Sequence, residues 1–152
     1  MQQPVGIAIE ARLRQSESGV RSIVESSPMG IHLYHLESPD RLVLTDSNPA
    51  SNRILGTPAG PLVGRTIEEA FPGLVGTEAP DRYRRICADG GSWEAEIEYR
   101  DDRFRGVYEV HAVGTAPARM AVMFLDVTER RRAEEARKHL EDQLRQSQKM
   151  EA

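Results

Sequence analysis

The chain has 152 residues, which is enough for one compact domain with appendages and too few for two domains of ordinary size. Hydrophobic residues make up 39% and charged residues 29%, as in globular proteins, and the longest apolar run, 120–125, is far shorter than the roughly 20 residues that span a bilayer. The net charge of −4 divides into −5 on residues 1–128 and +1 on residues 129–152, and an acidic body argues against nucleic-acid binding.

The first 25 residues show helical spacing that ends at Pro28 and Gly30. Four apolar side chains share one stripe of this predicted helix: Ile9, Leu13, Val20 and Val24. The stripe has no obvious partner in the rest of the chain. We therefore interpret residues 1–27 as a linker and dimerisation helix, with Leu13, Val20 and Val24 as its contact residues.

Two strands and several short helices are predicted next. Strands over 31–36 and 42–46 flank a tight turn, and five prolines between Pro49 and Pro80 limit any helix there to two or three turns. Asn48 followed by Pro49 is typical of a helix start, and Gly56 of a helix end. The predicted helices are Pro49–Leu55, Arg65–Ala70 and Pro80–Ala88.

From Ser92 the hydrophobic period changes to two. Trp93, Ala95, Ile97 and Tyr99 alternate with glutamates, which predicts a half-buried antiparallel strand with a solvated face. Two further strands follow, joined by a connection over residues 114–117. The fold class is therefore α+β: a five-stranded antiparallel sheet with short helices on one face and a flanking helix at each end. The predicted strands are Trp93–Tyr99, Arg105–Val113 and Arg119–Val127.

Residues 129–152 contain neither glycine nor proline and carry thirteen charges of mixed sign, which predicts a long solvated helix. Its apolar positions, with Ala136 and Leu140 at the centre, are spaced three and four residues apart. So narrow a seam cannot be buried within one chain. A parallel coiled coil with a second copy is the simplest partner, and it predicts a homodimer.

Together, these elements and their local sequences resemble the PAS family of sensory domains. The order of the elements agrees with that family, and so do four local strings. The strings are Leu13–Glu17 with Ile23–Ile31; Thr45–Ala50 through Gly56; Val63–Arg65 with Phe71-Pro72; and Asp126-Val-Thr128 with Arg131 and Glu134. The resemblance implies a PAS domain over residues 28–128 and a signalling helix over residues 129–152.

The last of these strings is similar to the signature through which PAS domains connect to an output helix. The resemblance thus implies a signal-transfer role for Asp126, Thr128, Arg131 and Glu134. A carboxylate at position 126 can pair with Arg131 or cap backbone N–H groups at the helix start. Residues 143–152 are similar to the segment ahead of the phosphoacceptor helix in sensor histidine kinases, which implies a kinase output domain after Ala152.

PAS domains often enclose a small molecule between the sheet and the short helices, and the candidate lining residues are Tyr34, Arg84, Trp93 and His111. These residues fill or cover the core equally well. The four histidines lack metal-ligand spacing, and 80–88 has no histidine where haem-binding PAS domains supply one. Cys87 lies outside the string that the flavin photoadduct requires, and is better explained as a small apolar residue. No cofactor is therefore assigned.

The sequence carries no catalytic motif, so we expect a sensor fragment rather than an enzyme. With one cysteine and no visible signal peptide, we expect it in the reducing cytoplasm. The favoured interpretation is a bacterial regulatory module that transmits a signal through a dimeric helix to a histidine kinase. The alternatives are a ligand-free dimerisation or protein-interaction module, and the input domain of a cyclic-dinucleotide enzyme or transcription regulator.

Overall fold

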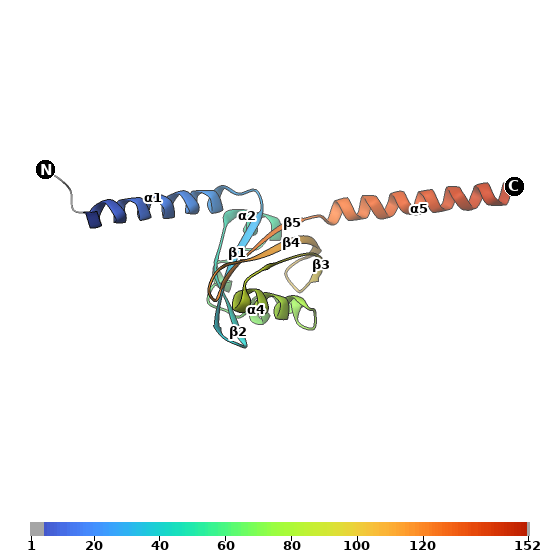
Figure 1. Ribbon diagram of the computed structural model, residues 1–152. Helices are drawn as coiled ribbons and strands as arrows, with labels where there is room; N and C mark the ends of the chain where they lie inside the picture. Colours follow the sequence, from blue (N-terminus) through green and yellow to red (C-terminus); the bar gives the residue numbers. More distant parts are fainter. Residues whose placement is uncertain (1–4, 152) are drawn as a thin grey trace.

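The computed structural model describes residues 5–151. Residues 1–4 and 152, which the sequence assigns to the ends of the two flanking helices, lie outside the described part. A central domain carries one long helix at each end, and the two helices extend from it in opposite directions (Figure 1). In chain order the elements are α1 Val5–Ser26, β1 Gly30–Ser38, β2 Arg41–Ser47, α2 Pro49–Leu55, the 3-10 helix η1 Gly60–Leu62, α3 Ile67–Ala70, the 3-10 helix η2 Pro72–Leu74, α4 Ala79–Asp89, β3 Ser92–Arg100, β4 Arg105–Ala116, β5 Arg119–Asp126 and α5 Thr128–Glu151.

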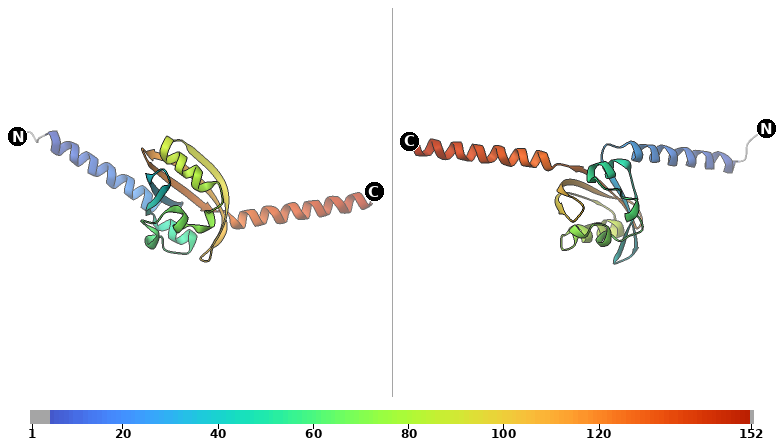
Figure 2. Two further views of the ribbon diagram at one scale, coloured as in Figure 1. Left: turned by 90° about the horizontal axis from the view of Figure 1, so that it is seen from below. Right: turned by 180° about the vertical axis from the view of Figure 1, so that it is seen from behind.

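The five strands form one antiparallel sheet in the order β2-β1-β5-β4-β3. The short helices α2, α3 and α4 lie over one face of this sheet, while α1 and α5 point away from it (Figure 2). The core fills the space between sheet and helices, and includes Leu42, Leu44, Ile67 and Met120, each at most 1% exposed. The predicted α+β architecture is confirmed.

Local sequence signals account for the start and end of α2. The side chain of Asn48 accepts a hydrogen bond from the backbone N–H of Ser51, and Pro49 occupies the first helical position, where its missing N–H costs nothing. Gly56 ends the helix in a left-handed conformation with φ 69°, which side chains disfavour. Both termini agree with the sequence prediction.

Several boundaries differ from the prediction by one to three residues, and two of these differences have a clear local cause. Strand β4 continues through residues 114–116, which the sequence assigned to a connection, because its ladder with β5 resumes after a bulge and pairs Ala116 with Arg119. Only Pro117 and Ala118 form the turn, with Ala118 at φ 60°. Helix α3 begins two residues later than predicted, because Thr66 caps it by accepting from the backbone N–H of Glu69.

The two faces of the sheet have different chemistry. On β3, Trp93, Ile97 and Tyr99 are less exposed than the three alternating glutamates, as the period of two predicts.

The flanking helices are largely exposed. Helix α5 has no buried residue, and the seam residue Leu140 is 64% exposed. Leu13 and Val20 on α1 are likewise exposed, whereas Val24 near its end is half-buried.

Candidate functional site

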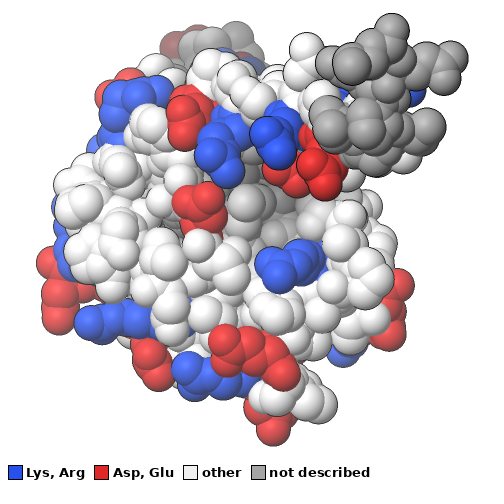
Figure 3. All heavy atoms as spheres, turned by 90° about the vertical axis from the view of Figure 1, so that its left-hand side faces the viewer, with Lys and Arg blue, Asp and Glu red and all other residues white. Residues whose placement is uncertain are grey.

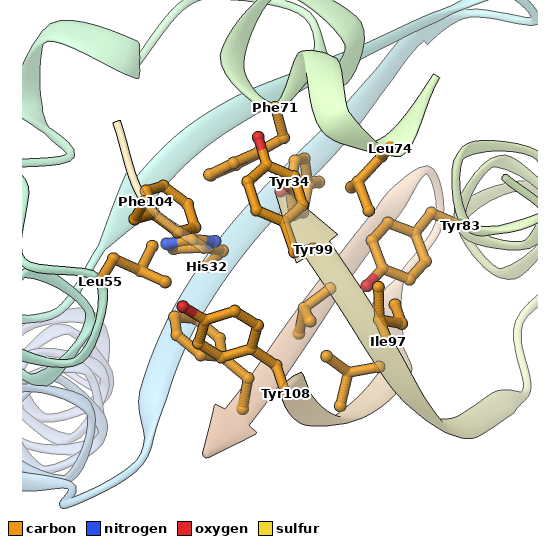
Figure 4. A pocket seen from close by; sticks show the side chains of 13 residues that line it. His32, Tyr34, Leu55, Phe71, Leu74, Tyr83, Ile97, Tyr99, Phe104 and Tyr108 are labelled. Atoms are coloured by element: carbon orange, nitrogen blue, oxygen red, sulfur yellow. The ribbon is translucent and has the colours of Figure 1, made fainter. Parts of the chain in front are cut away.

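A cavity of about 60 Å³ lies between the inner face of the sheet and the short helices. Aromatic side chains from β1, α4, β3 and β4 point toward it (Figure 4). Every tyrosine and phenylalanine of the chain takes part, four and three respectively. The lining residues are His32, Tyr34, Leu55, Phe71, Leu74, Tyr83, Ile97, Tyr99, Phe104, Tyr108, Val110, Val122 and Phe124.

The polar groups of this lining are neutral at physiological pH. Burial lowers the pKa of His32 to about 4, and its Nε2 forms a 2.6 Å hydrogen bond with the hydroxyl of Ser51. Burial also raises the pKa values of Tyr34 and Tyr83, and that of Tyr108 to about 12. Among the thirteen lining residues there is no Asp, Glu, Lys or Arg. The cavity therefore favours uncharged contents.

Of the four residues proposed from the sequence as ligand contacts, the structure brings only Tyr34 to the cavity. Arg84 forms an ion pair with Glu68 of α3 beside the core. Trp93 packs edge-on against the ring of Tyr83 without lining the cavity. His111 lies on the outer face of the sheet, where its ring nitrogens contact two glutamates. These three positions differ because strand parity and tertiary packing, rather than residue type, decide which side chains face inward.

Sequence reasoning missed most of the lining, including His32, which shares a strand face with Tyr34 because the two are two residues apart. Composition offered a weak signal: aromatic residues are scarce in this chain, at 5%, and all of its tyrosines and phenylalanines line the cavity. Cys87 is buried outside the cavity, and burial raises its pKa to about 11, which agrees with its interpretation as an apolar residue.

The turn between β3 and β4, residues 101–104, packs beside the cavity. The Asp101 carboxylate accepts from the backbone N–H groups of Arg103 and Phe104 and from the Tyr99 hydroxyl, and its 2.7 Å ion pair with Arg103 is largely buried on the Asp101 side. Burial raises the pKa of Asp101, but these hydrogen bonds outweigh it and lower the pKa to about 2. Arg103 also donates to the carbonyl of Ala70 at 2.6 Å, which ties the turn to α3.

The junction between β5 and α5 contains three linked hydrogen bonds of Asp126 and Thr128, beside a backbone hydrogen bond from the Val127 N–H to the Val107 carbonyl at 2.8 Å. Asp126, the last residue of β5, accepts at Oδ1 from both the backbone N–H and the hydroxyl of Thr128. The same hydroxyl accepts from the backbone N–H of Val107 on β4, at 2.9 Å. Thr128 therefore joins the first turn of the helix to two neighbouring strands. Of the two roles considered for Asp126, the structure shows the capping one.

The arginines that follow contact the outer face of the sheet instead of Asp126. Arg131 forms an ion pair with Glu96 of β3, and Arg130 forms one with Glu109 of β4 at 3.0 Å. The suggested pairing of Asp126 with Arg131 is thus wrong, because the Arg131 side chain extends over the sheet toward Glu96. Glu134 is exposed on α5, one turn further along.

The described residues show neither a metal-binding cluster nor a membrane-spanning helix. Within 5–151 there is no group of three or more His, Cys, Asp or Glu residues placed to hold a metal ion. None of the helices described is long and apolar enough to cross a membrane. On the side from which α1 projects, acidic and basic side chains are interspersed without forming a patch of one sign (Figure 3).

The comparisons with known proteins agree with this architecture. The profile of a family described as the PAS fold matches residues 24–132, which is most of the chain. A chain described as an RNA-binding Light-Oxygen-Voltage receptor superposes with a TM-score of 0.65 at 19% identity, over 86% of this chain and 38% of that one. The present chain therefore spans little more than a third of that receptor's length.

Two further solved structures are matched by this chain over nearly their whole length. A domain of a sensory box sensor histidine kinase/response regulator from Geobacter sulfurreducens has a TM-score of 0.60 at 15% identity, over 75% of this chain and 96% of that one. The PAS domain of BvgS from Bordetella pertussis has a TM-score of 0.55 at 16% identity, over 85% and 98%. The search of curated proteins gave no match.

The chain belongs to the PAS family, and its central domain is a signal-sensing module of that fold. The cavity lies between the sheet and the short helices of this fold, and the hydrogen-bonded junction lies where the fold ends and α5 begins.

Proposed function

We propose that this PAS module couples changes in its core to the orientation of α5, and that α5 passes them as a parallel dimer to an output domain outside the described residues. A cytoplasmic histidine kinase is the favoured output. The similarity of residues 143–152 to the segment ahead of a phosphoacceptor helix supports that choice, as does the fold shared with a sensor histidine kinase domain.

The hydrogen-bonded junction carries this proposal. α5 is joined to the sheet within its first turn through Thr128, and the exposed ion pairs of Arg130 and Arg131 add to that anchorage. Each such contact is worth about 1 kcal/mol or less, so a rearrangement of the sheet edge can change the exit angle of the helix at low cost.

The junction also lies next to the cavity. A Cβ atom on Gly106 would come within 2.9 Å of both the Thr128 hydroxyl oxygen and the Tyr108 hydroxyl oxygen. Tyr108 lines the cavity and is the register partner of Asp126. A displacement of the Tyr108 ring therefore reaches the residues that hold α5 through a single glycine.

The exposed seams support dimerisation. On α5, positions Ala133, Ala136, Leu140, Gln143, Ser147 and Met150 are spaced alternately by three and four residues, as in the a and d positions of a coiled coil. Leu140 is 64% and Leu144 62% exposed in the single chain. A second copy in parallel orientation would cover this seam, and the exposed stripe of α1 supplies further contact area.

Sedimentation of the unmodified protein at tens of micromolar tests the dimer, and a monomer there would contradict it. Leu140→Asp places two charges across the seam and should weaken association at least tenfold. Lys138→Asp changes charge two residues away, off the seam, and serves as the matched control that should remain dimeric.

Signal transfer is tested by fusing a histidine kinase after residue 152 and measuring autophosphorylation of Asp126→Ala. Removing a cap worth about 1 kcal/mol should change the kinase activity about fivefold while the domain remains folded. Glu129→Ala removes an exposed carboxylate from the same turn that does not pair with the sheet, and should leave activity unchanged. Unchanged activity in a folded, dimeric Asp126→Ala fusion would instead support a constitutive dimerisation module.

A further inference from the structure

The cavity approaches the surface on one side. Eleven of its thirteen lining residues are buried, whereas Ile97 on β3 and Phe104 just before β4 are half-buried. Phe104 stacks on Tyr99 with ring centroids 4.8 Å apart, and both rings line the cavity. The wall nearest to solvent is therefore formed in large part by the ring at the end of the 101–104 turn.

Polar contacts keep that ring in place. Asp101 accepts from the backbone N–H of Phe104, and Arg103 holds Asp101 through the 2.7 Å ion pair. The guanidinium of Arg103 also lies over the rings of Phe71 and Phe104, 5.8 and 5.4 Å from their centroids, and donates to the carbonyl of Ala70. One arginine side chain thus fastens the turn to the opposite wall of the cavity.

The turn can open without disturbing the rest of the core. Asp102 and Arg103 are exposed, and Phe104 is the one apolar side chain among the four turn residues. Opening breaks the contacts of Arg103 and partly exposes one ring, while both strands keep their ladders outside the turn. Local openings of this kind need far less free energy than global unfolding.

The lining also limits what can enter. It contains no charged side chain, and an ion would lose its hydration without gaining a partner there. At about 60 Å³ the cavity is smaller than the roughly 150 Å³ that accommodates benzene in an apolar protein interior. A ring-sized ligand therefore requires Phe104 to move outward.

We propose that the 101–104 turn is the gate of the core cavity, held closed by the side chain of Arg103, and that the cavity admits small uncharged apolar molecules up to the size of one aromatic ring. This inference rests on the proposed sensory function only in treating the cavity as the input site. Arg103 is a positioning residue, because it acts on the opening through Asp101 and Phe104.

The experiment uses the 152-residue protein and benzene as the probe, followed by NMR exchange at the methyl groups of Leu74, Ile97 and Val122. Because Phe104 is already displaced in the bound state, Arg103→Ala should raise the association rate of benzene about tenfold, leave its dissociation rate within twofold and so lower its Kd about tenfold. A residue that only stabilised the fold would not accelerate association. Asp101→Asn, which removes the ion pair but retains an acceptor, should raise the association rate by a smaller factor.

Arg105→Ala is the matched control, because this exposed arginine follows the turn but does not line the cavity; its rates should stay within twofold of those of the unmodified protein. Benzoate replaces benzene to test the ligand class, and it should leave the same methyl signals unchanged. Equal benzene rates in Arg103→Ala and the unmodified protein would overturn the gate. Binding of benzoate as tight as that of benzene would overturn the ligand class. Neither result depends on α5 or its output, so failure here is distinct from failure of the proposed signalling.

Discussion

The central domain and helix α5 are held in place by different forces. In the domain, apolar side chains such as Leu42 and Met120 are almost fully buried, and aromatic rings converge on one cavity. In α5 no residue is buried, and polar contacts near its start determine where it points. Burial gives the domain its stability, whereas a few polar contacts hold the start of the helix, and we propose that these contacts allow its position to change.

The largest effect is expected from removing a ring of the core. The Phe124 ring is 4% exposed and packs against His32 and Tyr108. Phe124→Ala should therefore lower the free energy of unfolding by about 3–5 kcal/mol. Leu144→Ala on α5, where the side chain is 62% exposed, should change it by less than about 0.5 kcal/mol. Chemical denaturation at concentrations where the protein is monomeric checks both. Similar losses in the two variants would remove the contrast between the regions.

The second effect is a pH dependence confined to the core. His32 has a folded pKa of about 4 against 6.5 for the free side chain, so the unfolded chain binds the additional proton between these values. Stability should therefore decline as pH falls from 6.5 to 4, by up to about 3 kcal/mol from this residue. His32→Gln should lack that part of the slope. Parallel pH profiles of unfolding for the two proteins would contradict the neutral, buried state of His32.

A smaller effect is expected at the junction. Thr128→Val keeps the shape of the side chain but leaves the Val107 N–H without its acceptor, at a cost of about 1 kcal/mol. Hydrogen exchange should then accelerate about fivefold at Val107 and in the first turn of α5, while protection in β1 and β2 is retained. Acceleration spread evenly over the whole domain would indicate that Thr128 supports the fold rather than the junction.

The smallest effect is expected on the outer face. Glu96 pairs with Arg131, 35 residues later in the sequence, but both side chains are more than a third exposed. Glu96→Gln should change the unfolding free energy by less than about 0.5 kcal/mol, because solvent screens such pairs. Thermal unfolding at low and high salt measures it. A loss above 1 kcal/mol that disappears at high salt would mean that this pair holds α5 more strongly than the capping contacts.

Features encoded over a few neighbouring residues could be predicted from the sequence. Asn48, Pro49 and Gly56 specify the ends of α2 through their own backbone preferences and hydrogen bonds. The alternation along β3 specifies which of its side chains face the core. Asp126 and Thr128 were identified because the motif that resembles the PAS signature is itself local.

Features that depend on distant packing could not be predicted in this way. The cavity is lined by side chains that are far apart in the sequence: His32 and Phe104 both line it although they are 72 residues apart. Strand type alone does not tell whether His111 faces inward, and its register opposite Glu94 places it outside. The pairing of Arg131 with Glu96 depends on the angle between α5 and the sheet, which the sequence pattern does not specify.

The most direct test of the account measures where α5 points when its junction is weakened. Spin labels at Arg53→Cys on α2 and Arg145→Cys on α5, in a Cys87→Ala background, report this orientation, since residue 145 lies about 25 Å along the helix from Thr128. Labelled protein is diluted with unlabelled protein so that each distance belongs to one chain. We expect Asp126→Ala to broaden or shift the distance distribution and Glu129→Ala to leave it as in the otherwise unmodified protein. Identical distributions in all three would contradict the claim that the Asp126–Thr128 contacts set the orientation of the helix.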